Sequence, residues 1–137
     1  MNDLYTSTIF ETLIGELNKL SKNAELIVMN NCASCRVNNQ FDMHLIYLEE
    51  TQTVHIVSYI QVLDDNTRMS VYETLLEANF LATREGAFAI TPDRHYFTYN
   101  ESRCIYQVSP FELDIMMSRV IQISQKTLSI NSVISSN

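Results

Sequence analysis

The segment Thr53–Val62 of this 137-residue chain has apolar side chains on both of its faces. Residues two apart in a β-strand point to the same side, and β-branched and aromatic residues are typical of strands. One predicted face carries Val54, Ile56, Ile60 and Val62, and the other carries Val57 and Tyr59, followed by Leu63 directly after the segment. An antiparallel sheet with one face in water normally alternates apolar and polar residues, so something is expected to cover the second face. A partner or second subunit and another helix of the same chain are both candidates.

Three other segments have apolar residues three and four apart, the spacing of amphipathic helices. The first is residues 4–21. The second begins at Ser70, which with Glu73 forms a candidate capping box, and ends before Gly86. The third begins at Ser109, a candidate helix cap that is followed by Pro110 and Glu112. These three helices are expected to pack on the predicted sheet.

Six segments are predicted strands, with polar clusters such as NNCASCRVNN as connections. They are ELIVM, FDMHLIYL and TVHIVSYIQV before the middle helix, and GAFAI, HYFTY and RCIYQV after it. The predicted fold class is α+β: a twisted antiparallel sheet with three helices, in the order α-β-β-β-α-β-β-β-α. Residues 1–126 are expected to form a single domain. Residues 127–137 have no helix cap and few charges, and are expected to form a frayed tail.

The charge and composition exclude several classes of function. The formal net charge is −7, with 16 acidic and 9 basic residues and no long basic run, so neither nucleic acid nor an anionic membrane surface is an expected partner. No apolar stretch approaches the roughly 18 residues that cross a bilayer, and the N-terminus lacks the pattern of a signal peptide. Three cysteines do not suggest a disulfide framework. We therefore expect a cytoplasmic protein with free thiols.

The pair Cys32 and Cys35 is the motif most suggestive of chemistry, because a two-residue gap suits a zinc ligand pair or a redox dithiol. A structural zinc needs four ligands, and only Cys104 and scattered histidines remain. A redox dithiol would be expected at a helix N-terminus, whereas this pair precedes a strand. His44 and His55 each stand alone on predicted strands, and two glycines cannot build a nucleotide-binding loop. Neither enzymatic activity nor a cofactor or metal is expected.

The order of elements and the sequence Leu75–Phe80, LLEANF, ahead of Gly86 resemble the class I type III secretion chaperones, the Tir-chaperone family. The resemblance covers about residues 3 to 125, and LLEAN is close to the Leu-Leu-x-Ala-Asn pattern of that family's middle helix. It implies a homodimer in the bacterial cytoplasm, without enzymatic activity or ATP. Such a dimer binds the N-terminal chaperone-binding segment of a secreted effector and keeps it extended and competent for secretion.

The resemblance also places the middle helix at the two-fold axis of the dimer. The expected dimer-interface residues are Val71, Leu75, Leu76, Asn79 and Phe80. Asn79 is expected either to form hydrogen bonds near the axis or to cap nearby backbone. The alternative is a helix buried within its own monomer, with Asn79 at its edge.

Binding of an extended segment calls for apolar grooves and open strand edges. The predicted effector-binding residues lie on helix one and on the second and third predicted strands: Phe10, Leu17, Met43, Leu45, Tyr47, Val57 and Tyr59. Two other functions remain open. One is a small α+β adaptor that binds a folded partner, and the less favoured one is a redox or zinc protein that uses Cys32 and Cys35.

Overall fold

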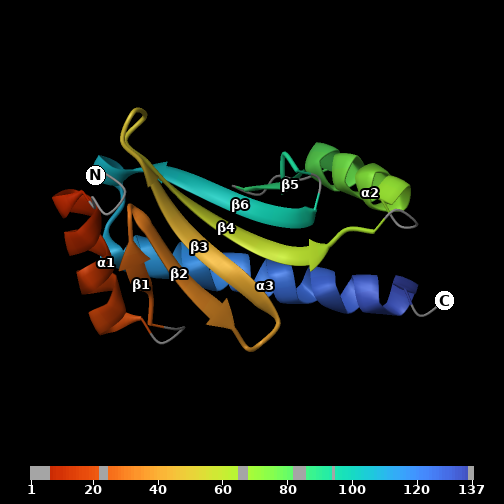
Figure 1. The fold of residues 1–137 in the computed structure, drawn as a ribbon, viewed down its shortest axis with the longest axis horizontal. Coiled ribbons are helices and arrows are strands. Elements are labelled where there is room, and N and C mark those ends of the chain that lie inside the picture. Colours follow the sequence, from red (N-terminus) through yellow and green to blue (C-terminus); the bar gives the residue numbers. More distant parts are fainter. Residues whose placement is uncertain (1–6, 22–24, 65–67, 82–85, 94, 136–137) are drawn as a thin grey trace.

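The computed structural model describes residues 7–21, 25–64, 68–81, 86–93 and 95–135 (Figure 1). Its helices are α1 (Thr8–Leu20), α2 (Arg68–Leu81) and α3 (Pro110–Ser135), with a short 3₁₀ helix at Ile105–Gln107. Its strands are β1 (Ile27–Met29), β2 (Cys32–Val37), β3 (Phe41–Leu48), β4 (Thr53–Val62), β5 (Ala87–Ile90) and β6 (Tyr96–Cys104).

The strands form one antiparallel sheet in the order β1-β2-β3-β4-β6-β5, so β1 and β5 are its two edge strands. Helix α3 runs behind the sheet in Figure 1 and packs on β4, β6 and α1. Helix α2 lies at the end of the molecule opposite α1 and packs on β5. The predicted α+β class, the antiparallel sheet and the three helices are confirmed.

The main core lies between the sheet and helices α1 and α3. From α1 it takes one apolar face, on which Phe10 and Leu17 are fully buried. Phe10 stacks on Tyr47 of β3 with ring centroids 5.8 Å apart. Burial of side chains of this size stabilises the folded state by roughly 1.5–3 kcal/mol each, which offsets the poor helix propensity of Gly15 in the middle of α1.

Strand β2 is the main difference from the predicted order. The segment CASCRV was interpreted as part of a polar connection, but it pairs with both β1 and β3. The structural order is therefore α-β-β-β-β-α-β-β-α, with four strands before α2. The turns on either side of β2 are made by Asn30–Asn31 and Asn38–Asn39, all with positive φ. Asparagine tolerates this backbone region better than other residues that carry a side chain.

The region after α2 holds two strands where three were predicted. HYFTY and the start of RCIYQV belong to the single strand β6, which runs through the NES segment without a turn. The paired strand β4 has ten residues against nine in β6, and its register with β6 continues to Thr53–Cys104. Pairing along a long neighbour therefore prevailed over the local turn preference of Asn100 and Ser102.

The helix starts were predicted with mixed success. At α3 the Ser109 cap is confirmed, because the Glu112 backbone N–H donates to Ser109 Oγ at 3.1 Å. The Glu112 side chain turns back onto the cap, where its Oε1 accepts from the Ser109 hydroxyl at 3.1 Å. At α2 the prediction was wrong: the helix begins at Arg68, so Ser70 lies inside it. Helix α3 also continues to Ser135, which corrects the predicted frayed tail at 127–137 over residues 127–135.

A buried ion pair joins β6 to α3. The Glu101 side chain is completely buried and accepts hydrogen bonds from Arg119 Nη2 at 2.6 Å and Nε at 2.8 Å. The Tyr99 hydroxyl donates to the same carboxylate at 3.1 Å. A buried charge is tolerated only when it is paired and hydrogen-bonded, so this pair fixes where α3 crosses the sheet.

Candidate partner-binding surface

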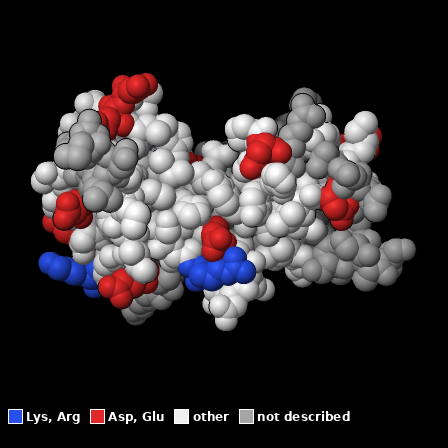
Figure 2. All heavy atoms as spheres, viewed as in Figure 1, with Lys and Arg blue, Asp and Glu red and all other residues white. Residues whose placement is uncertain are grey.

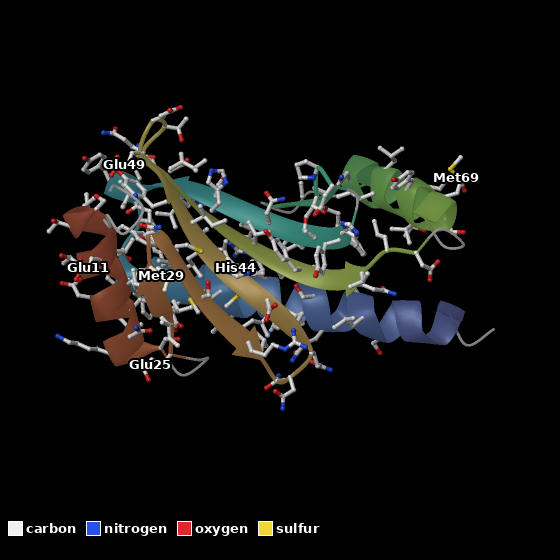
Figure 3. All side chains as sticks on the ribbon, in the orientation of Figure 1. Glu11, Glu25, Met29, His44, Glu49 and Met69 are labelled. Atoms are coloured by element: carbon white, nitrogen blue, oxygen red, sulfur yellow. The ribbon has the colours of Figure 1, made fainter. Side chains whose placement is uncertain are left out.

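The sheet has a second face, opposite α1 and α3, which we call the outer face. It is defined by Ile27 and Met29 of β1, Cys32 and Ser34 of β2, His44 and Ile46 of β3, and Val57 and Tyr59 of β4. These residues share a face because strand side chains alternate and the cross-strand pairs Met29–Cys32, Cys32–Ile46 and His44–Val57 are directly opposite. Figure 3 shows Met29 and His44 on this part of the sheet.

The outer face is apolar and open to solvent. Ile27 is 73% exposed and Met29 is 64% exposed, while Ile46, Val57 and Tyr59 are partly exposed. The Tyr59 ring contacts His44 and stacks on Tyr96, with centroid distances of 5.1 and 5.3 Å. Figure 2 shows few charged groups over the middle of the molecule, viewed as in Figure 1. Among the described helices, α1 and α3 lie on the opposite face and α2 packs on β5. The helices of the described chain thus leave this face uncovered.

Five predicted effector-binding residues lie in the core instead. Phe10, Leu17, Met43 and Leu45 are fully buried and Tyr47 is 6% exposed. The prediction of these five as contact residues is corrected, because side chains covered by their own chain do not offer a surface to a partner. The physical reason is that both faces of β3 and β4 are apolar, so the pattern of apolar residues does not indicate which face the helices cover. Val57 and Tyr59 do lie on the outer face.

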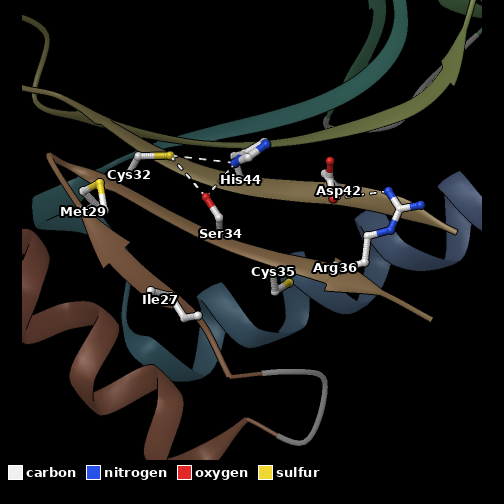
Figure 4. Close-up of a pocket in the computed structure, with 8 residues that line it drawn as sticks. All are labelled: Ile27, Met29, Cys32, Ser34, Cys35, Arg36, Asp42 and His44. Carbon is white, nitrogen blue, oxygen red and sulfur yellow. Dashed lines mark hydrogen bonds and ion pairs between the residues drawn. The ribbon is translucent and has the colours of Figure 1, made fainter. Parts of the chain in front are cut away.

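The outer face also contains a cluster that sequence reasoning missed. Ser34 Oγ lies 2.7 Å from His44 Nδ1, and Cys32 Sγ lies 3.6 Å from Ser34 Oγ and 3.8 Å from His44 Nδ1 (Figure 4). The hydrogen bond with His44 lowers the pKa of the Cys32 thiol, against the effect of burial. The same bond raises the pKa of His44. Both shifts favour a thiolate beside an imidazolium.

Cys32 and Cys35 do not act as a pair. They are three residues apart on β2, so their side chains point to opposite faces of the sheet. Cys35 packs against the core, and burial raises the pKa of its thiol. Within the part of the chain that the structure describes, no group of three or more His, Cys, Asp or Glu side chains could hold a metal ion. The geometry therefore gives no support to a shared zinc or dithiol site.

Helix α2 has both packed and exposed residues among its described side chains. Val71 packs against a small cluster with Leu63 and Phe97, whereas Leu76 is 72% exposed. A groove of about 290 Å³ between α2 and β5 is lined by Tyr72, Leu76, Asn79, Phe88, Ala89 and Ile90. The predicted interface residues Leu75 and Phe80 belong to α2, but their side chains lie outside the described part. Met69, at the far end of α2 in Figure 3, is 71% exposed.

Asn79 caps backbone, which is one of the two roles predicted for it. Its side-chain amide donates to the Phe88 carbonyl at 2.9 Å and accepts from the Phe88 backbone N–H at 3.0 Å. Asn18 of α1 bonds to Leu26, just before β1, in the same way at 3.0 and 2.8 Å. Each asparagine therefore replaces the neighbouring strand that an edge residue lacks. This explains the polar residue in the apolar LLEANF segment.

Comparison with known proteins rests on structure alone, because no protein-family model and no curated protein matches the sequence. The chain aligns over 90% of its length with 93% of a chain from the ExsC–ExsE complex, with TM-score 0.71 and 13% identity. It also matches a chain from the HopA1–SchA chaperone–effector complex, covering 88% of this chain and 94% of that one, with TM-score 0.69 and 11% identity. A third match is the complex of the Yersinia pestis type III secretion chaperone SycH with a stable fragment of YscM2. It covers 85% of this chain and 98% of that one, with TM-score 0.65 and 13% identity. The chain has the fold of type III secretion chaperones.

The structural alignments establish the chaperone fold. Because the sequence identities are only 11–13%, the role of each residue is interpreted from its own surroundings. Within this fold the chain combines an open apolar sheet face with the exposed side chains of Met69 and Leu76 on α2. The described helices include none that is both long and apolar enough to span a bilayer.

Proposed function

We propose that this protein is a type III secretion chaperone that binds the N-terminal chaperone-binding segment of a secreted effector. The observation that carries the proposal is the uncovered apolar outer face, on a fold whose solved examples include a chaperone–effector complex. The bound segment is held extended in the bacterial cytoplasm until export. No bond is made or broken, so the chaperone needs neither a catalytic residue nor a cofactor.

The outer face suits an extended segment for two physical reasons. Three of the four strands that form this face, β1, β3 and β4, offer apolar side chains: Ile27, Met29, Ile46, Val57 and Tyr59. Beyond Leu26, whose main-chain groups are occupied by Asn18, the edge strand β1 offers main-chain hydrogen-bonding groups beside them, as in binding by a short added strand. Ordering a disordered segment costs about 2 to 5 kcal/mol or more, and a broad apolar surface supplies the burial that offsets this cost.

Aspartate at both Val57 and Tyr59 is expected to weaken effector-segment binding at least about 100-fold, because two buried charges would replace apolar contacts. Binding is measured by titration calorimetry with an effector fragment of roughly 50 to 100 residues that co-purifies from a secreting bacterium. The matched control is Phe111→Asp, on α3, where the native side chain is 66% exposed and lies away from the outer face. Circular dichroism checks that each variant is folded.

The result also separates the chaperone from a small adaptor. A chaperone binds the isolated, unfolded fragment, whereas an adaptor binds only the folded partner. Unchanged affinity in the folded Val57→Asp, Tyr59→Asp variant would show that the outer face is not the binding surface.

We further propose that the protein is a homodimer whose interface is formed by α2. Leu76 is exposed beside the groove between α2 and β5, and a two-fold interface can bury such a residue against its own copy. The interface includes Val71, Leu75, Asn79 and Phe80 of the same helix.

Leu76→Asp is expected to shift the protein from dimer to monomer at micromolar concentration, because two like charges would face each other across the two-fold axis. Sedimentation velocity measures the change. The control is Leu20→Asp, at the end of α1, where the native leucine is also exposed. A dimer that persists in Leu76→Asp places the interface elsewhere.

A further inference from the structure

The cluster of Cys32, Ser34 and His44 has no part in binding an extended segment through apolar contacts. It lies on the outer face beside a hollow of about 550 Å³. Besides the cluster, the hollow is lined by Ile27 and Met29 of β1 and by Arg36 and Asp42 of β2 and β3 (Figure 4). A nucleophile, a base and an open cavity are therefore adjacent.

We propose that Cys32 is a site of reversible thiolation by low-molecular-weight disulfides of the glutathione type, with Ser34 and His44 activating its thiol. The site follows from three contacts that the fold brings together. Strand β2 places Cys32 and Ser34 two residues apart on one face, and the β2–β3 register sets Ser34 directly opposite His44. The Asn38–Asn39 turn fixes that register.

The contacts support transfer of the thiol proton. Ser34 Oγ lies within reach of both partners, at 2.7 Å from His44 Nδ1 and 3.6 Å from Cys32 Sγ. With His44 protonated, its Nδ1–H donates to Ser34 Oγ, and the Ser34 hydroxyl donates to the Cys32 sulfur. The hydrogen bond with His44 lowers the pKa of Cys32. The thiolate fraction of Cys32 is thus larger than that of an ordinary cysteine at the same pH.

The reaction is ordinary thiol–disulfide exchange. The Cys32 thiolate attacks one sulfur of the small disulfide, a new S–S bond forms to Cys32, and the original S–S bond breaks. The departing thiolate takes up a proton from the imidazolium, which received it from Cys32. Cys32 is oxidised and half of the disulfide is reduced to a free thiol, so the small disulfide itself is the oxidant. An excess of the reduced small thiol reverses the step.

The surroundings select Cys32 and fit the small molecule. Cys35 faces the core and burial raises the pKa of its thiol, so it is the less reactive of the two. Arg36 lies at the other end of the hollow, four residues along β2 and so about 13 Å from Cys32. Its guanidinium pairs with Asp42 at 3.2 Å and is about half exposed. It can therefore also form an ion pair with a carboxylate of the glutathione-type disulfide.

Thiolation at Cys32 also affects the proposed effector site, and this consequence rests on the proposed function. A bound glutathionyl group brings charge and bulk next to Met29 and Ile46, which belong to the apolar outer face. The modified chaperone is therefore expected to bind the effector segment more weakly than the reduced one.

The test measures the reaction of the folded protein with oxidised glutathione and, separately, with iodoacetamide. Peptide mapping by mass spectrometry follows Cys32, Cys35 and Cys104 in the same sample. At pH 7 we expect Cys32 to react about tenfold faster than either other cysteine. In His44→Gln we expect this advantage to fall to about threefold or less. Ser34→Ala is a second variant that breaks the same relay, and circular dichroism checks that both variants fold.

The pH dependence of alkylation provides an independent readout. The charged groups that face the Cys32–His44 pair are Asp42 on β3 and its ion-pair partner Arg36 on β2. The titratable Tyr59 on β4 has its ring centroid 5.1 Å from that of His44, and Ile27 and Met29 on β1 are uncharged. In Cys35→Ala, Cys104→Ser protein, the rate should rise with pH through an inflection below the ordinary thiol value of about 8.5. In the same background, His44→Gln should move this inflection toward that value.

The outcomes are distinct. A Cys32 that reacts no faster than Cys35 and Cys104, or a rate and inflection that His44→Gln leaves unchanged, overturns the thiolation site. Selective thiolation that leaves effector-segment affinity unaltered overturns the regulatory consequence. If the reduced protein binds no effector segment while Cys32 is still thiolated selectively, the proposed function fails and the thiolation site stands.

Discussion

Replacing Arg119 with methionine is expected to lower the free energy of unfolding by about 3 to 5 kcal/mol at neutral pH. The reason is the position of Glu101, whose side chain is completely buried while that of Arg119 is 33% exposed. Methionine fills much of the space of arginine but leaves the Glu101 carboxylate with Tyr99 as its remaining described donor. An unpaired charge in the interior costs much more than the pair contributes in net stability. Urea denaturation followed by circular dichroism measures the loss.

A double variant separates the buried charge from the packing of Arg119. Glu101→Gln with Arg119→Met removes both charges and should recover most of the lost stability, because no unpaired carboxylate remains. If the double variant is as unstable as Arg119→Met alone, lost packing around α3 is the cause. A loss below about 1 kcal/mol in Arg119→Met would contradict the buried ion pair itself.

Leu45→Ala is expected to destabilise the protein by about 2 to 5 kcal/mol, whereas Ile46→Ala should cost about 1 kcal/mol. The two residues are neighbours on β3 and point to opposite faces. Leu45 is fully buried in the main core, and Ile46 lies on the outer face with partial exposure. Truncating Leu45 leaves a cavity, while truncating Ile46 removes contacts that water can replace.

The same pair of variants reports on binding. Ile46→Ala should reduce affinity for the effector segment while the fold stays intact, because Ile46 belongs to the outer face. Leu45→Ala, studied at a temperature where it remains folded, should bind normally. Equal destabilisation by the two substitutions would mean that both faces of β3 are covered.

The helices were predictable because their apolar residues lie on one side. The face of α1 that contains Phe10 and Leu17 is the buried face, as an amphipathic pattern predicts. Likewise, Ser109 and Glu112 are sufficient to define the start of α3. The sheet was harder, because β2 has few of the β-branched or aromatic residues on which strand prediction depends.

The exposed face of the sheet could not be predicted from apolar residues alone. Leu45 and Ile46, or Ile56 and Val57, have similar side chains and opposite surroundings, and only the position of α1 and α3 distinguishes them. The Cys32–Ser34–His44 cluster depends on the β2–β3 register, which was not recognised. The repeated Asn-Asn pair, at residues 30–31 and 38–39, is the available signal: both pairs form turns that set the register on either side of β2.

The hydrogen bonds of Asn18 and Asn79 have a consequence for how molecules of this protein meet. An unpaired sheet edge can form a ladder with a strand of another molecule, and repeated pairing of this kind produces fibrils. At Leu26 and at Phe88 both main-chain groups are already occupied by an amide from a helix of the same molecule. A regular ladder from a neighbouring copy cannot continue past either residue. The protein can therefore expose an apolar sheet face while its two sheet edges resist strand-by-strand association between copies.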